Sequence, residues 1–216
     1  MRTLVIDTAT AACSVALIEH GGVIARAHEV VGRGHAERLI PMIAELPDGG
    51  RAARILVDVG PGSFTGVRVG IAAARGLAFG WGVTAIGYSS MTLIAAAAFA
   101  RRHLPELAVI LEGGHGEVFM QMFAPDAGPI GPLASHQPAA ALALLGGRPA
   151  FGNGIHRLLA LDPDIDTEDV LPDAADAILL ADDPLPPSPI YGRAPDAKPL
   201  SAAASGIEGL PGGVVP

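Results

Sequence analysis

The sequence predicts an α/β protein built from two halves of the βββαβα type, the second of which is abbreviated. Short apolar runs rich in β-branched residues alternate with longer runs of helical periodicity, and this order restarts after Pro105. A glycine-dense turn within residues 58–70 also joins a predicted buried strand to a long helix, which is where nucleotide-binding α/β folds usually keep their chemistry. We therefore expect one half at residues 1–103, a second at 104–198 and a tail with little fixed structure at 199–216.

The first half opens with three predicted strands, because apolar and β-branched residues cluster at residues 3–6, 14–18 and 23–31. Residues 19–22 form the tight turn between the second and third strands, since two glycines there permit the reversal. A helix follows at residues 35–46, and Pro41 is expected to bend or shorten it. The half then closes with four elements: a strand at 55–59, the glycine-rich helix, a short strand at 83–86 and an alanine-rich helix at 90–103.

The second half repeats this order with fewer residues. Its predicted elements are strands at 107–111, 118–123 and 130–133, a helix at 138–145, and a strand that ends in the turn at 151–154.

The composition excludes several classes of protein. The chain has 216 residues and a net charge of -8, which does not favour autonomous binding of tRNA or DNA. Its longest apolar stretch, at residues 91–100, falls short of the roughly 20 residues of a bilayer span, and no apolar signal core opens the chain, so we expect a cytoplasmic protein without a membrane segment. The single cysteine, Cys13, excludes intrachain disulfides and is expected to be a buried, inert thiol.

The glycine-dense turn does not match the common phosphate-binding or hydrolase motifs. A Walker A loop needs a lysine, but the only lysine in the chain is Lys198. A dinucleotide fingerprint needs an acidic residue about 20 positions further on, and residues 83–87 contain none. The hydrolase elbow Gly-x-Ser-x-Gly fails because Pro61 and Thr65 flank Ser63 where glycines are required. Ser63 or Thr65 is expected to cap the helix that follows.

Two helical faces are candidates for contact with another protein. Small residues recur at helical spacing on the glycine-rich helix, and the helix at 35–46 carries an apolar face. These faces either form half of a four-helix interface with a similar partner or pack on the chain's own sheet. Arg68 and Arg75, seven residues apart, share one side of the second helix and either reach partner carboxylates or phosphates or remain solvated.

Several segments together resemble the bacterial TsaB family, also called YeaZ. The glycine turn Gly60-Pro61-Gly62-Ser63-Phe64-Thr65-Gly66 with Val67-Arg68-Val69-Gly70 is the most specific of them. The others are Asp7-Thr8-Ala9-Thr10 with residues 13–17, His35 with residues 39–43, residues 116–119, and residues 191–197. The resemblance covers residues 1 to about 198 and implies the actin, sugar-kinase and heat-shock-ATPase superfold with two duplicated subdomains.

The resemblance also implies a non-catalytic subunit that binds TsaD. TsaD transfers a threonylcarbamoyl group to the adenine beside the anticodon in tRNAs that read codons beginning with A. Under this interpretation the chain meets the ATPase TsaE and tRNA only through the complex, and it forms a homodimer when isolated. The partner interface is expected to comprise eleven residues of the two helices: His35, Leu39, Met42, Ile43, Leu46, Gly66, Val67, Gly70, Ala73, Ala74 and Leu77.

The residues that would do chemistry in this superfold are altered here. Active relatives carry Asp-x-Gly in the turn after the first strand, whereas this chain has alanine at Ala9. The catalytic sister family carries His-x-Glu-x-His on its first helix, and here Leu39 replaces the second histidine, so we expect no metal site. We also expect no cofactor of the chain's own, and at most a weak nucleotide contact in the complex through Asp7, Thr8 and Thr10. The alternative is a small active phosphotransferase or ATPase of the same superfold; a peptidase is not supported, because no nucleophile, base and orienting group converge.

Overall fold

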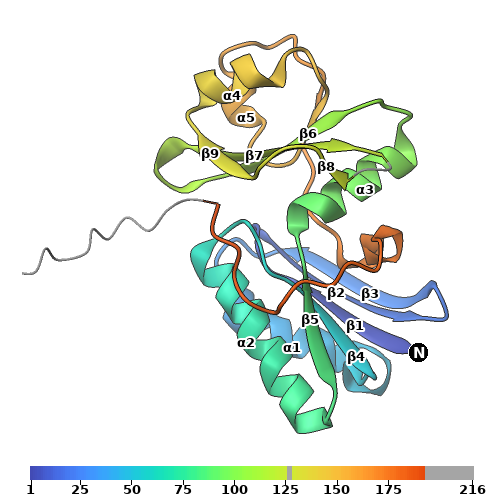
Figure 1. Ribbon diagram of the computed structural model, residues 1–216. Helices are drawn as coiled ribbons and strands as arrows, with labels where there is room; N and C mark the ends of the chain where they lie inside the picture. The colour runs from blue at the N-terminus through green and yellow to red at the C-terminus, as the bar shows by residue number, and fades with distance from the viewer. Residues whose placement is uncertain (126–127, 193–216) are drawn as a thin grey trace, which may run out of the picture.

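The computed structural model describes residues 1–125 and 128–192, and the expected tail at 199–216 lies outside this range. Two mixed sheets lie one above the other, and helices cover both faces of each (Figure 1). The layers follow in the order α1 and α2, first sheet, α3 with the 3-10 helix η3, second sheet, and α4 with α5. This confirms the predicted α/β class.

The first sheet has the strand order β3-β2-β1-β4-β5. Its strands are β1 (Arg2–Asp7), β2 (Ala12–Glu19), β3 (Gly22–Val30), β4 (Arg54–Asp58) and β5 (Thr84–Tyr88). The first three are antiparallel, whereas β1, β4 and β5 run parallel. The turn from β2 to β3 is as tight as predicted, because His20 and Gly21 adopt the positive φ angles that two-residue hairpin loops require.

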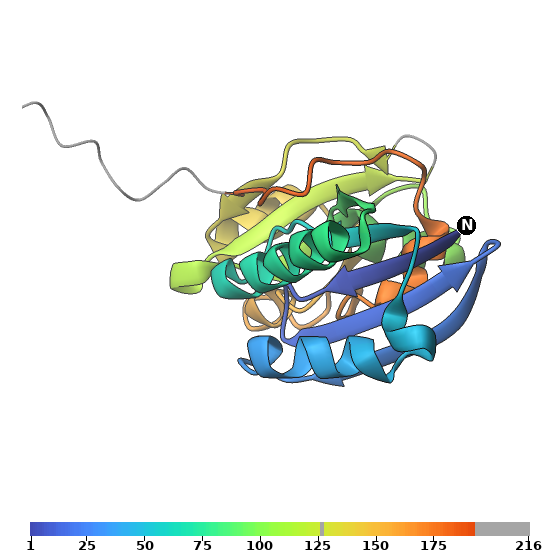
Figure 2. The same cartoon turned by 90° about the horizontal axis from the view of Figure 1, so that it is seen from below.

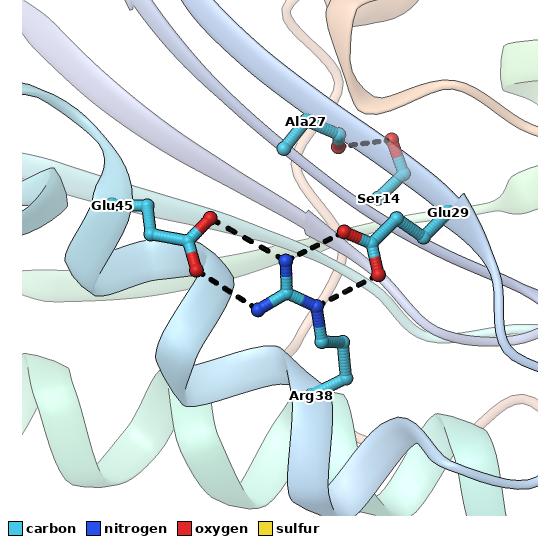
Figure 3. A network of polar contacts seen from close by, with 5 residues as sticks. All are labelled: Ser14, Ala27, Glu29, Arg38 and Glu45. Carbon is cyan, nitrogen blue, oxygen red and sulfur yellow. Dashed lines mark hydrogen bonds and ion pairs between the residues drawn. The ribbon is translucent and has the colours of Figure 1, made fainter.

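Helices α1 (His35–Glu45) and α2 (Phe64–Trp81) lie side by side on one face of the first sheet (Figure 2). Their apolar residues form one core with the inward side chains of β1, β2 and β4. At the edge of this layer Arg38 of α1 donates hydrogen bonds to both oxygens of Glu29 on β3, at 2.6 and 2.7 Å, and to Glu45 (Figure 3). This partly exposed bidentate pair fixes α1 against the edge strand. Pro41 lies inside α1 and does not end it.

Local sequence signals set the ends of α2. The Ser63 side chain accepts a hydrogen bond from the amide of Gly66 at 3.2 Å, so Ser63 rather than Thr65 is the N-cap. At the other end Gly82 adopts a left-handed conformation with φ of 68°, which glycine tolerates without a steric penalty. The glycine-dense turn therefore leads directly into an 18-residue helix.

Helix α3 (Ser90–Arg101) connects the two sheets and packs on both of them. Leu93 contributes to the core on the first sheet, whereas Met91, Ile94 and Ala98 contribute to the core of the second. The second sheet has the order β11-β10-β6-β7-β8, with β9 also paired to β7. Its strands are β6 (Leu107–Glu112), β7 (Val118–Ala124), β8 (Gly128–Pro129), β9 (Ala134–His136), β10 (Ala150–Phe151) and β11 (Thr167–Glu168), and α4 (Pro138–Leu145) and α5 (His156–Leu159) cover its outer face.

Both sheets place the first strand of their half in the centre, with the second strand on one side and, on the other, the strand that follows the first α-helix after these strands, which is β4 or β10. This shared order supports the predicted duplication. The predicted strand at residues 130–133 is wrong, because the chain pairs on either side of it, at β8 and β9. Pro132 has no amide donor, which disfavours a strand through this stretch. The short elements α5, β11 and η3 have too few residues to show a periodic pattern.

After the second sheet the chain returns to the first half. Helix η3 (Ala174–Leu179) covers the face of the first sheet opposite α1 and α2. Residues 184–192, which we call the strap, then run past β5 and α2 (red in Figure 1). Leu185 and Gly87 exchange two backbone hydrogen bonds, of 2.7 and 2.9 Å. The division into residues 1–103 and 104–198 remains a proposal, and we revise it by assigning residues 174–192 to the first half. Among the described residues, no helix combines the length and apolar character that a bilayer span requires.

Candidate functional site

A cleft of about 920 Å³ separates the two halves. The first half lines it with the turn after β1, the glycine-dense turn and the start of α2. The second half contributes the turn between β6 and β7 and a residue that follows β10, Asn153, while strap residues 189–192 close one side. A concave site between two halves is the default place to look for a ligand.

The glycine-dense turn packs directly onto the turn that follows β1. The amide of Ser63 donates a hydrogen bond of 2.6 Å to the carbonyl of Ala9. A Cβ atom at Gly62 would collide with the same carbonyl, and one at Gly66 would collide with the carbonyl of Thr8. Glycine is required at both positions because the backbone of one turn touches that of the other.

The turn after β1 uses its polar groups within the protein. The Ala9 amide donates to Asp7, the Ala12 amide donates to the Thr10 hydroxyl, and the Thr8 hydroxyl donates to the carbonyl of Gly66 at 2.8 Å. Asp7 and Thr8 are fully buried and do not line the cleft, whereas Thr10 does. This arrangement does not fit a cradle for a polyphosphate, because that requires backbone amides that point at the ligand.

Behind this turn lies a buried pair of carboxyl groups. Asp58, at the end of β4, accepts hydrogen bonds through Oδ1 from the amides of Gly60 and Ser90, at 2.8 and 2.9 Å. Its Oδ2 is buried without a donor from the described residues, and the Asp58 carboxyl lies within hydrogen-bond reach of Asp7, which accepts a hydrogen bond of 2.8 Å from the Tyr88 hydroxyl. A proton on Asp58 would form a hydrogen bond between the two carboxyl groups and so give the buried Oδ2 a partner.

Burial sets the protonation of this pair. It raises the pKa of the Asp7 carboxyl to about 7 from an ordinary 3.8, although the hydrogen bonds from Tyr88 and Ala9 oppose the shift. Burial and the neighbouring charge of Asp7 raise the pKa of Asp58 well above its ordinary value. Sequence reasoning missed Asp58, whose position at a strand end next to the glycine-dense turn was the available signal.

The predicted interface residues lie mostly in the protein's own core, which corrects the expectation that they form an accessible face. Leu39, Met42 and Ile43 are at most 3% exposed. His35 is buried as well, and its Nε2 lies 3.1 Å from the carbonyl of Ala12. Of the eleven residues, only Ala73 and Leu77 are partly exposed; the nine buried ones are His35, Leu39, Met42, Ile43, Leu46, Gly66, Val67, Gly70 and Ala74.

The glycines of α2 fall into two groups, one facing the protein interior and the other facing solvent. A Cβ at Gly66 or Gly70 would strike Thr8, so these two positions serve contact within the chain. A Cβ at Gly76 or Gly80 would meet no atom of the described residues within 4 Å. These two glycines lie one helical turn apart on the solvent side, next to Ala72 and the 92% exposed Phe79.

Helices α1 and α2 also expose residues that lie outside the eleven predicted interface residues. We call this set the outer face, and it comprises Ile40, Pro41, Ala44, Ala72, Arg75, Gly76, Phe79 and Gly80. It contains one charged side chain and is otherwise small or apolar. An exposed face of this kind, carried by two adjacent helices, is typical of a surface that another protein covers.

Comparison with known proteins places the chain in a family. The profile of the family described as TsaD, tRNA N6-adenosine threonylcarbamoyltransferase, matches residues 10–126. The Escherichia coli protein described as tRNA threonylcarbamoyladenosine biosynthesis protein TsaB is 38% identical over 133 residues, which cover 58% of this chain and 56% of that protein. The solved structure of YeaZ from Pseudomonas aeruginosa superposes with a TM-score of 0.76 and 25% identity, over 88% of this chain and 99% of that one. The chain belongs to the TsaB (YeaZ) family.

This membership confirms the resemblance and the actin-like superfold predicted from it. The match spans about half the length of the TsaB proteins of E. coli and Haemophilus influenzae, at 56% and 52%. A further relative, an uncharacterized protein of Mycobacterium bovis, is 30% identical over 92% of this chain and 94% of its own length. The TsaB-family fold is therefore present over nearly the whole described range.

Proposed function

We propose that this TsaB-family chain acts in tRNA threonylcarbamoyladenosine biosynthesis as a subunit without a catalytic centre of its own, and that it binds TsaD. Family membership supports the process, since its relatives carry that description. The observation that carries the non-catalytic role is the turn after β1, where Asp7 and Thr10 accept hydrogen bonds from the amides of Ala9 and Ala12, two donors that a phosphate would need.

The outer face is our proposed contact surface for TsaD, in place of the buried residues of α1 and α2. It combines exposed apolar side chains with two glycines that let a partner helix approach closely. Arg75 at its border provides a cation for a partner carboxylate. The same face is the proposed contact of a homodimer when the chain is isolated.

Gly76→Arg tests this surface. The new side chain would start from a position with no described neighbour within 4 Å, and arginine is a better helix former than glycine, so the monomer is expected to stay folded. The arginine side chain would occupy the volume of a partner helix packed on Gly76. In gel filtration TsaD should therefore elute separately from the variant. Gly131→Arg is the matched control, because Gly131 also faces open space but lies in the second half. Complex formation by Gly76→Arg equal to that of the control would refute the outer face as the TsaD surface.

Titration of the chain with magnesium ATP, followed by a hydrolysis assay, tests the non-catalytic role. We expect no turnover by the chain alone, because the amides of Ala9 and Ala12 are bonded to Asp7 and Thr10 and are not available to phosphates. Turnover that depends on Asp7 would instead support an active phosphotransferase or ATPase.

A further inference from the structure

The mouth of the cleft carries an exposed cluster of two aromatic rings and a guanidinium. Phe64, the first residue of α2, is 67% exposed, and Tyr191 of the strap is 61% exposed. Arg68 lies between them: its Cζ is 3.2 Å from the centre of the Phe64 ring and 6.0 Å from that of Tyr191, and it donates a hydrogen bond of 3.0 Å to the Tyr191 hydroxyl. All three residues line the cleft.

The protein fixes this cluster in place. Arg75, two turns along α2 from Arg68, donates to the carbonyl of Pro187 at 2.7 Å and to the hydroxyl of Ser188. The amide of Ile190 donates to the carbonyl of Val59 at 2.8 Å. The strap therefore reaches the cleft already anchored, and Tyr191 is held beside α2 without being buried.

The cluster has no evident role in the fold. Neither Phe64 nor Tyr191 belongs to any of the hydrophobic cores formed by the described residues. No carboxylate of the described residues lies within ion-pair distance of Arg68. Two large rings and a cation at the entrance of a cleft match the chemistry that holds planar heteroaromatic groups, through stacking and cation–π contacts.

We propose that the mouth of the cleft binds a nucleobase, stacked on the free ring faces of Phe64 and Tyr191 beside Arg68. The affinity is expected to come from the base rather than from phosphates, because Asp7 and Thr10 already accept hydrogen bonds from the amides of Ala9 and Ala12, and the carboxylate of Glu112 also lines the cleft. Such stacking is independent of net charge, which accords with a chain of charge -8. The base comes either from a free nucleoside or from an unstacked position of an RNA loop, and the RNA source rests on the proposed function.

Fluorescence titration tests the proposal with two sets of probes. The RNA probe is an anticodon stem-loop that carries 2-aminopurine in place of the adenine beside the anticodon, and it is titrated with the complex of the full chain and TsaD. Free adenosine and ATP are titrated with the full chain alone. Phe64→Ala and Tyr191→Ala should each weaken binding by about tenfold or more. Tyr191→Phe keeps the ring and should bind as the wild type does.

Leu144→Ala is the control, because Leu144 is an exposed apolar side chain on α4 of the second half, does not line the cleft and lies outside the outer face. All these side chains are more than half exposed, so a thermal melt should show folded variants. Loss with the RNA probe alone identifies an RNA base, loss with adenosine identifies a free nucleoside, and either supports the site. Wild-type affinity of both alanine variants for every probe, no binding of any probe by the wild type, or an equal loss in Leu144→Ala would overturn it. Gel filtration shows separately whether the proposed function fails, because the complex with TsaD would then not form. In that case the titrations of the chain alone with adenosine and ATP still test the site.

Discussion

Replacing Asp58 by asparagine should change how the stability of this protein depends on pH. The asparagine side chain keeps an oxygen for the amides of Gly60 and Ser90 and places an amide donor where the proton bridges Asp58 to Asp7. The folded structure is therefore preserved, whereas one titrating group is removed.

The magnitude follows from proton linkage. The folded-state pKa values of Asp7 and Asp58 both lie above the ordinary 3.8, so above that pH the folded chain binds more protons than the unfolded chain. The free energy of unfolding therefore falls as pH rises, by at most about 1.4 kcal/mol per pH unit for each group. Between pH 5 and 7 two groups contribute in the wild type, and only Asp7, whose pKa is about 7, contributes in Asp58→Asn. The wild type should thus lose up to about 3 kcal/mol more than the variant over this interval.

Urea denaturation of both proteins at pH 5, 6 and 7 measures the difference. Asp183→Asn is the control for loss of one carboxyl group, because Asp183 is exposed. Equal slopes for the wild type and Asp58→Asn would refute the shared proton, since Asp58 would then be ionised in the folded chain.

Four further substitutions test the packing of the first half. Gly70→Ala should lower the melting temperature, because its Cβ would strike Thr8. Gly76→Ala should leave the melting temperature unchanged or raise it, since its Cβ would meet no described residue. A lower melting temperature for Gly76→Ala than for Gly70→Ala would contradict the inward direction of Gly70. Leu39→Ala should reduce the free energy of unfolding by about 2–5 kcal/mol, as expected for a core leucine. If the variant instead bound TsaD more weakly while the monomer kept its stability, Leu39 would be an interface residue. Ser63→Ala should cost about 1 kcal/mol in chemical denaturation through loss of the N-cap of α2, and no loss would mean that the cap is dispensable.

Local patterns predicted most of the fold. The strands of the first sheet and the helices α1 to α4 follow apolar runs and helical periodicity, which depend on neighbours in sequence. The same periodicity marked Leu39, Met42 and Ile43 as an apolar face but could not say whether a sheet or a partner covers it. The small residues of α2 raised the same question, which the contacts of Gly66 and Gly70 with Thr8 answer.

The candidate site was less predictable because its residues are distant in sequence. Tyr191 meets Arg68 across 123 positions, and Asp58 meets Asp7 across more than 50. Each position alone has an ordinary explanation as a surface aromatic or a strand-end acid. Only the return of residues 184–192 past β5 and α2 brings the cluster at the cleft mouth together.

The position of α3 also bears on how far the two halves can move. One side of this helix packs in the core on the first sheet, and the other side packs in the core of the second sheet. Any hinge opening would have to strip apolar side chains from one of these cores, and each fully buried side chain exposed to water costs about 1.5–3 kcal/mol. The cleft should therefore keep a nearly constant width, as suits a rigid platform that presents its surfaces in a fixed orientation.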